Sequence, residues 1–265
     1  MFSHSHALCQ SLIHGPLLIG DLPEASTFPR DRLRLPHIIP KLDLEQKLGH
    51  LYEDAMAVLL EESSGFELLA RNLQLQEKTT LGEIDFLVRD LASQQLIHLE
   101  LATKFYLGVE TKTGLALPGP DPRDNYSRKI QRLRTHQLTL VRNHRNSLPE
   151  SFRTEPITVH SLVYGCLFDH VHAPQPAHPE FIYPHCRRGQ WLTIDECADH
   201  FHQDSILELI PKSLWPVSFD HLEDAPLEKW TPAPELERCL MIRANHGPDP
   251  CFVVPSHYPQ CAGDA

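Results

Sequence analysis

The chain has 265 residues, of which 41% are hydrophobic and 22% charged, and its formal net charge is −11. These are the proportions of a globular protein, so they exclude wholesale disorder, a collagen-like repeat and a coiled coil. A chain of this length buries a full core without a metal or disulfide staple, as one large domain or as a core domain with an extension.

The N-terminal 20 residues are nearly uncharged but contain Ser, His and Gln throughout, and the first Lys or Arg is Arg30. A secretory signal begins with basic residues, and a membrane span needs about 20 predominantly apolar residues. We therefore expect no membrane segment and a cytoplasmic location. The seven cysteines include no CxxC pair, so we expect reduced, mostly buried thiols.

Pro-rich segments come first, and a helix is then predicted over 42–62, where leucines recur at helical spacing. Strands are predicted over 66–74, 84–89 and 96–105. A Gly/Pro-rich stretch at 114–122, a basic helix and a strand-like run at 157–168 follow. The order helix, strands, helix, strand predicts an α/β core whose sheet is covered by helices.

From about residue 174 onwards proline is frequent and periodicity is weak. We expect an irregular Pro-rich extension packed on the core, with short helices near 193–201 and 205–210. The sequence is accordingly divided into a core at 1–172 and a C-terminal extension at 173–265.

The basic helix lies within residues 123–145, which hold seven Lys or Arg against one acid in an otherwise acidic chain. A period of 3.6 residues places these side chains on one stripe toward the core: Tyr126, Ile130, Leu133, Gln137, Leu140 and Val141. The opposite face is either a solvated basic surface or a row of contacts to a phosphate backbone. The second interpretation makes Arg123, Arg128, Lys129 and Arg132 candidate nucleic-acid-binding residues.

Two predicted strands each carry an acid between hydrophobic neighbours, Asp85 in one and Glu100 in the next. Alternation along the second strand puts His98, Glu100 and Lys104 on one face. Buried acids are costly unless they are paired or bind a cation, and Mg²⁺ takes one or two carboxylates. The simpler alternative is a Glu–Lys pair along one strand with an Asp in a turn.

These strands resemble the PD-(D/E)XK phosphodiesterase superfamily, whose signature is an acid at the start of one strand and (D/E)xK on the next. More closely, over roughly residues 8–220, the chain resembles a bacterial group, domain-of-unknown-function family 1853. The matching segments are LGHLYE (48–53), TLGEIDFL (80–87), HLELATKFYL (98–107), GPDPRD (119–124), YGCLF (164–168), RGQW (188–191) and LIPKSLW (209–215).

The superfamily resemblance implies a nuclease-like core with a central mixed sheet flanked by helices, dependence on Mg²⁺ (or Mn²⁺) and phosphodiester hydrolysis in DNA or RNA. It makes Asp85 and Glu100 metal ligands, gives Lys104 the role of orienting the water, and adds Glu53 as a helix acid. The close family brings no established activity.

Lys104 follows Glu100 by four residues, whereas the superfamily pattern has two, and Ala102 holds the usual place. Along a regular strand the two residues are roughly 13 Å apart, so the lysine must lean back or a bulge must shorten the gap. Two hypotheses follow: a Mg²⁺-dependent nuclease, or an inactive nuclease-fold module that binds nucleic acid or protein. The sequence has no GxSxG motif for a serine hydrolase and indicates no particular oligomeric state.

Overall fold

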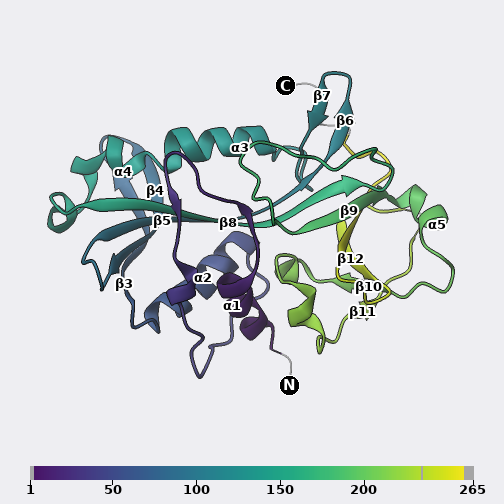
Figure 1. Ribbon diagram of the computed structural model, residues 1–265, viewed down its shortest axis with the longest axis horizontal. Helices are drawn as coiled ribbons and strands as arrows, with labels where there is room; N and C mark the ends of the chain where they lie inside the picture. The colour runs from purple at the N-terminus through teal and green to yellow at the C-terminus, as the bar shows by residue number, and fades with distance from the viewer. Residues whose placement is uncertain (1–2, 234, 260–265) are drawn as a thin grey trace.

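The computed structural model describes residues 3–233 and 235–259, which form a mixed α/β fold around one large sheet (Figure 1). In this part of the chain eleven strands join the sheet in the order β11-β10-β12-β13-β9-β8-β5-β4-β3, with β1 and β2 paired to β8 beside this path. Their bounds are β1 Leu17–Ile19, β2 Ser26–Thr27, β3 Phe66–Gln76, β4 Thr80–Asp90, β5 Leu96–Leu107, β8 Ile157–His170, β9 Arg188–Thr193, β10 Leu207–Ile210, β11 Glu228–Lys229, β12 Leu240–Ala244 and β13 Pro250–Val254.

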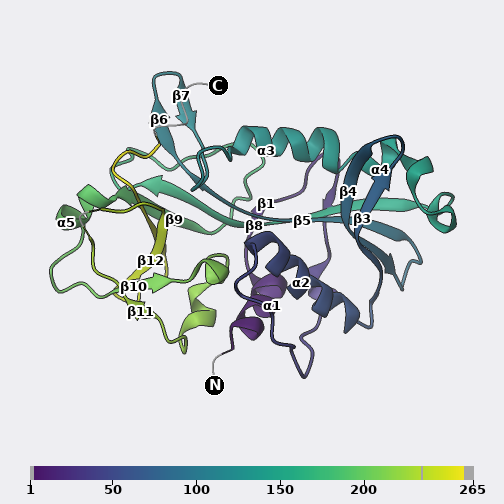
Figure 2. The same cartoon turned by 180° about the vertical axis from the view of Figure 1, so that it is seen from behind.

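Helices cover both faces of the part of the sheet that is formed by β3, β4, β5 and β8. Figures 1 and 2 show α1 and α2 against one face and α3 across the other, while a small separate hairpin, β6 with β7, projects beside α3. The bounds are α1 His4–His14, α2 Leu48–Glu61, β6 Val109–Thr111, β7 Gly114–Ala116, α3 Tyr126–Arg132, a π-helical turn η2 Leu133–Gln137, α4 Leu140–Asn143 and α5 Cys197–His200. Short 3-10 turns are η1 Arg30–Arg32, η3 Arg145–Ser147, η4 Glu150–Phe152, η5 Ile194–Glu196, η6 Lys212–Leu214 and η7 Phe219–Leu222.

β5 and β8 are neighbours and the two longest strands of the sheet. They are parallel and pair without a register shift from Leu96 opposite Ile157 to Leu107 opposite Phe168. Parallel strands need a crossover connection, and α3 lies on the segment that provides it. Both strands are largely buried because helices cover the two faces. The observed sheet flanked by helices confirms the α/β class expected from the order of elements.

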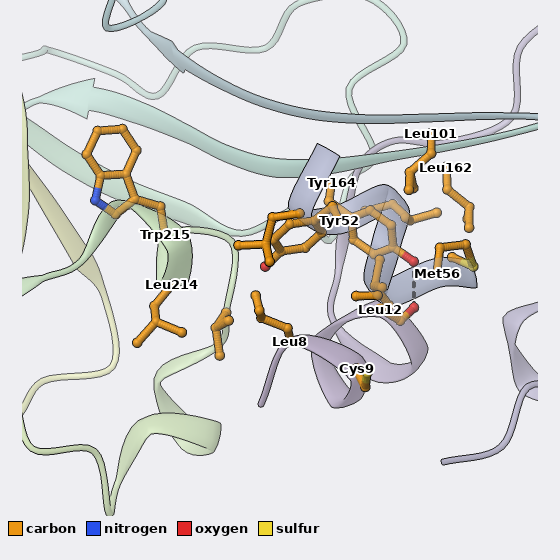
Figure 3. Close-up of a cluster of buried hydrophobic side chains, with 14 of the residues drawn as sticks. Leu8, Cys9, Leu12, Tyr52, Met56, Leu101, Leu162, Tyr164, Leu214 and Trp215 are labelled. Carbon is orange, nitrogen blue, oxygen red and sulfur yellow. Dashed lines mark hydrogen bonds between the residues drawn. The ribbon is translucent and has the colours of Figure 1, made fainter. Parts of the chain in front are cut away.

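The larger core lies between the sheet and the helices α1 and α2. Figure 3 shows Leu8 and Leu12 of α1 and Tyr52 of α2 packed beneath Leu101 of β5. The Tyr164 hydroxyl donates a hydrogen bond to the carbonyl of Leu12 at 2.5 Å, which ties α1 to β8. A second cluster, which includes Tyr126, Ile130 and Leu133, fills the space between α3 and the opposite face.

Gly165 of β8 lies opposite Lys104 of β5 in a conformation with φ of +143°. A Cβ at this position would lie 1.6 Å from the carbonyl oxygen of Lys104. Glycine is therefore required here by both its backbone conformation and the close approach of β5.

The expectation of an irregular C-terminal extension is corrected by the structure. Strands β9 to β13 continue the same sheet beyond β8, and Trp215 and Phe252 pack in the larger core. The helix expected near 205–210 is instead strand β10, which pairs with β12 and β11. Such short apolar runs do not distinguish helix from strand by periodicity, and pairing with distant strands decides the outcome.

The described cysteines are all free, and five of the six are buried, as expected; Cys261 lies outside the described residues. Burial raises the pKa of Cys9 to about 12, so its thiol is held in the unreactive protonated form. No helix in the described ranges is long and apolar enough to cross a membrane.

Candidate active site

Asp85 and Glu100 lie on neighbouring antiparallel strands, β4 and β5. The last residues paired in their ladder are Phe86 and Leu99, and the same register places Asp85 opposite Glu100. There, Asp85 Oδ2 accepts a hydrogen bond from the backbone N–H of Leu101 at 2.8 Å. The Asp85 carboxylate thus takes the place of a backbone carbonyl next to Glu100.

Glu100 is held at both carboxylate oxygens. Its Oε1 lies 2.7 Å from His98 Nε2, and its Oε2 accepts a hydrogen bond from Gln137 Nε2 at 2.7 Å. An ionised carboxylate only accepts, so His98 Nε2 is the donor to Glu100 when this acid is charged. Glu100 is only 2% exposed, and His98 is fully buried with no hydrogen-bond partner at Nδ1 among the described residues. The orientation of this acid is therefore fixed from two sides.

The two acids interact strongly. Burial raises the pKa of Asp85 to about 8, and the negative charge of Glu100 acts in the same direction, while the Leu101 N–H opposes it. Like-charged carboxylates in a partly desolvated site retain a proton near neutral pH. A bound cation would relieve the same repulsion.

Glu53 approaches this pair from α2. Its Oε2 accepts a hydrogen bond from Asn72 Nδ2 at 3.3 Å and lies 3.4 Å from His50 Nδ1. Asn72 lies on β3 opposite Asp85 and adopts a left-handed φ of 48°. The Glu53 charge contributes to the raised pKa of Asp85, so the predicted helix acid faces the site although it does not share a hydrogen bond with Asp85.

Lys104 is on the same strand as Glu100 but its ammonium is engaged elsewhere. Lys104 Nζ donates to Asp124 Oδ2 at 2.6 Å. β5 pairs regularly with β8 on both sides of Ala102, so no bulge shortens the distance to Glu100. The predicted role of Lys104 stays a prediction, and it requires this side chain to leave Asp124.

Lys129, which helical periodicity places at the flank of the basic face, lies near the acids. It is half-buried, and its Nζ donates to Gln137 Oε1 at 2.8 Å. Gln137 in turn donates to Glu100, so one amide joins the lysine to the carboxylate. Burial and the charge of Lys104 lower the pKa of Lys129, whereas Glu100 and Asp85 act in the opposite direction.

The four candidate nucleic-acid-binding residues line one open hollow with a volume of about 780 Å³. Arg123, Arg128, Lys129 and Arg132 form its walls with Lys104. We call this hollow the basic groove. Gln137 also lines it and donates to Glu100, so this side chain joins the groove to the acids, which lie behind the lining.

The guanidinium groups of the groove differ in their partners. Arg123 is paired with Asp121 at 2.7 Å, and Arg128 donates to the carbonyl of Arg123 at 2.7 Å. Arg128 and Arg132 are exposed, and neither has an acidic partner at ion-pair distance within the described part of the chain. Their charge is therefore available for an anionic ligand.

The carboxylate pair fits a Mg²⁺ or Mn²⁺ ion by its chemistry, since these ions take one or two carboxylates and complete their shell with water and phosphate oxygens. Across residues 3–233 and 235–259, no three His, Cys, Asp or Glu side chains are placed to hold a metal together. A metal at this site would have Asp85 and Glu100 as its two protein ligands, and Gln137 would have to release Glu100 Oε2.

A second hollow of about 450 Å³ lies far along the sheet beside Trp191 and His170. The Trp191 indole N–H donates to Gly108 at 2.9 Å, and His170 lies 3.2 Å from Glu196. None of the predicted site residues lines this hollow, so the acids joined to the basic groove are the stronger candidate site.

His98 and Gln137 both contact Glu100, and the sequence patterns did not identify either residue as part of the site. Strand alternation placed His98 on the face of Glu100, which was the available signal. Gln137 was counted in an apolar stripe, and a polar residue in such a stripe is the sign that it contacts something polar. Arg128 and Arg132 are exposed, as that helical pattern predicted.

The fold and the site define a mixed α/β protein with paired carboxylates beneath a basic groove. The model of a family described as Domain of unknown function (DUF1853) matches residues 26–258. The chain belongs to this family. Comparison with curated proteins and with solved structures gives no match.

Proposed function

We propose that this chain is a metal-dependent nuclease of the PD-(D/E)XK superfamily that hydrolyses phosphodiester bonds in DNA or RNA. The observation that carries the proposal is the Asp85–Glu100 pair on adjacent strands beneath a groove lined by basic side chains. The raised pKa of Asp85 supports it, because burial and then the charge of Glu100 disfavour the free carboxylate, and a bound cation would offset both effects. A cytoplasmic location remains part of the proposal.

Asp85 and Glu100 would hold a Mg²⁺ or Mn²⁺ ion. When bound, such an ion neutralises charge on the phosphate and makes a water more acidic. The protein fixes the two acids in advance: the Leu101 N–H orients Asp85, and His98 orients Glu100. Such positioning by neighbouring groups maintains the geometry of a metal site.

The basic groove would bind the phosphate backbone through Arg128 and Arg132, with Arg123 at its margin. Contacts of this kind position a nucleic acid without reading its sequence. Glu53, held by Asn72, would assist from the side of α2.

The alternative proposal is a catalytically inactive module that binds nucleic acid or protein. Two contacts favour it: Gln137 occupies Glu100 Oε2, and Lys104 is paired with Asp124. Both contacts must open for the expected catalytic arrangement to form.

Cleavage of single- and double-stranded DNA and RNA, with Mg²⁺, with Mn²⁺ and with a chelator, tests the proposal. We expect metal-dependent cleavage that falls at least about 100-fold in Asp85→Asn and in Glu100→Gln. Glu83→Gln is the matched control, because Glu83 is an exposed acid on the same strand as Asp85. Nucleic-acid binding without cleavage of any substrate would support the module instead.

A further inference from the structure

We propose that Lys129 of α3, positioned by Gln137, supplies the ammonium group of the carboxylate site, the role that the superfamily resemblance gives to Lys104. This inference rests on the proposed nuclease function and identifies the residue that acts on the phosphate. Its basis is the chain of contacts from Lys129 through Gln137 to Glu100, 2.8 Å and then 2.7 Å long.

The ammonium of Lys104 is committed to another group. Asp124 accepts its hydrogen bond at 2.6 Å, and both side chains are only about one-third exposed. The regular pairing of β5 holds the Lys104 backbone two pleats from Glu100. Moving this ammonium to the acids would therefore break an ion pair and fold the side chain back along its own strand.

Lys129, by contrast, has no acidic partner at ion-pair distance in the described part of the chain, so no ion pair holds its ammonium away from the acids. Its side chain is half-buried, and it feels the charges of both Glu100 and Asp85. It also lines the basic groove, the space where a phosphate would lie. One side chain thus borders both the acids and the ligand space.

The backbone explains why Gln137 can support Lys129. The turn Leu133–Gln137 is π-helical, closed by the hydrogen bond from Leu138 N to Leu133 O at 2.9 Å. A π turn accommodates about one residue more than an α turn. Gln137 therefore takes roughly the position that the seventh residue after Lys129 would have in a regular helix with about 3.6 residues per turn, which is on the same face. Such turns often occur at functional sites.

In hydrolysis the oxygen of a water bonds to phosphorus while one P–O ester bond breaks. A proton leaves the water to solvent, and the departing oxygen takes up a proton from solvent. Lys129 would stabilise the charge that develops on the non-bridging oxygens and orient the attacking water. Gln137 is a positioning residue, since it contacts Lys129 and Glu100 and no reacting atom.

Three variants separate the two lysines: Lys129→Met, Lys129→Arg and Lys104→Met. Lys229→Met is the control, because Lys229 is exposed on β11 at the far end of the sheet. Single-turnover cleavage rates and nucleic-acid affinities are measured for each, with thermal unfolding to establish that each variant is folded.

We expect Lys129→Met to lower the single-turnover rate by about 100-fold or more and to weaken nucleic-acid binding by less than about tenfold. Lys129→Arg keeps the charge and should recover part of the rate. Lys104→Met should lower the rate clearly less than Lys129→Met. A larger loss in Lys104→Met, or a loss of affinity alone in Lys129→Met, would overturn the assignment while leaving the nuclease function standing.

Calorimetric titration with MgCl₂ gives a readout that is independent of turnover. Removing a positive charge next to the carboxylates should strengthen Mg²⁺ binding, so Lys129→Met should bind the ion about threefold more tightly or better. Lys104→Met should change this affinity less, since Asp124 neutralises its charge. Equal changes in the two variants would contradict the proposal, and a wild-type protein that cleaves no substrate would overturn it together with the proposed function.

Discussion

The backbone N–H of Leu101 donates to Asp85 Oδ2 across two strands at 2.8 Å, one residue beyond Glu100. This hydrogen bond holds one acid against another in a partly buried position. Burial, and then the negative charge of Glu100, raise the pKa of Asp85 from an ordinary 3.8 to about 8, although the Leu101 N–H acts in the opposite direction.

The contribution of Asp85 to the stability of the protein should fall as pH rises from about 4 to 8. In this window the folded protein retains the Asp85 proton that the unfolded chain has lost, so unfolding releases a proton. Asp85→Asn keeps an acceptor for Leu101 but cannot ionise. Its free energy of unfolding relative to wild type should therefore grow by roughly 2–5 kcal/mol across the window. Urea unfolding at pH 5, 7 and 8.5 measures this difference, and a constant difference would contradict the raised pKa.

Mg²⁺ or Mn²⁺ should raise the melting temperature of the wild-type protein. An ion that binds only the folded state stabilises it by mass action, about 2.7 kcal/mol at a concentration 100 times Kd. Thermal unfolding with the ion and with a chelator measures the shift. Glu100→Gln should lose it, and Glu83→Gln should retain it. A shift that persists in Glu100→Gln would place the ion elsewhere.

The double variant Arg128→Ala with Arg132→Ala should bind every nucleic-acid sequence more weakly. Each lost phosphate contact lowers the slope of log K against log salt by about 0.9 for duplex DNA, so the slope should fall by about 2. Fluorescence anisotropy at several salt concentrations measures it. Lys229→Ala with Arg238→Ala removes the same charge from exposed positions outside the groove. An equal effect in that control would mean that nucleic acid is attracted by the overall positive charge and not bound in the groove.

Gly165→Ala should destabilise the protein by about 2–4 kcal/mol, because the added methyl meets the Lys104 carbonyl and the positive φ disfavours it. Gly49→Ala is the matched control. Gly49 lies in α2 with open space around it, so alanine should stabilise by up to about 1 kcal/mol. Chemical denaturation of both variants tests the pair, and a neutral Gly165→Ala would mean that β8 can shift away from β5.

Local patterns in the sequence were sufficient to predict the helices and strands in the N-terminal half of the chain that carry the candidate site. The helix containing Glu53, the acid-bearing strands and the basic helix are all found near their expected positions, because each has a long period of its own. Strands β10 to β13 have at most five residues each and depend on pairing with one another. They are too short for an alternating pattern to predict them from the sequence.

The acids of the site were predictable because a charge between hydrophobic neighbours is unusual in a strand. The hydrogen-bond partners of Lys104 and Lys129 could not be predicted from the sequence. Asp124 meets Lys104 only through tertiary folding, and the turn that brings Gln137 over Glu100 departs from the 3.6-residue period. Sequence spacing cannot show which of two lysines reaches an acid when one lies on a strand and the other on a helix.

The position of β8 has a consequence for fragments of this protein. Its last residues, Leu167 to His170, pair with β9, and the ring of Phe168 packs against Phe252 at 4.6 Å between centroids. A fragment that ends at residue 172 would expose this strand edge and its aromatic surface to solvent. Uncovered edges of this kind recruit other chains, so the fragment should form aggregates in size-exclusion chromatography at concentrations where the full chain does not.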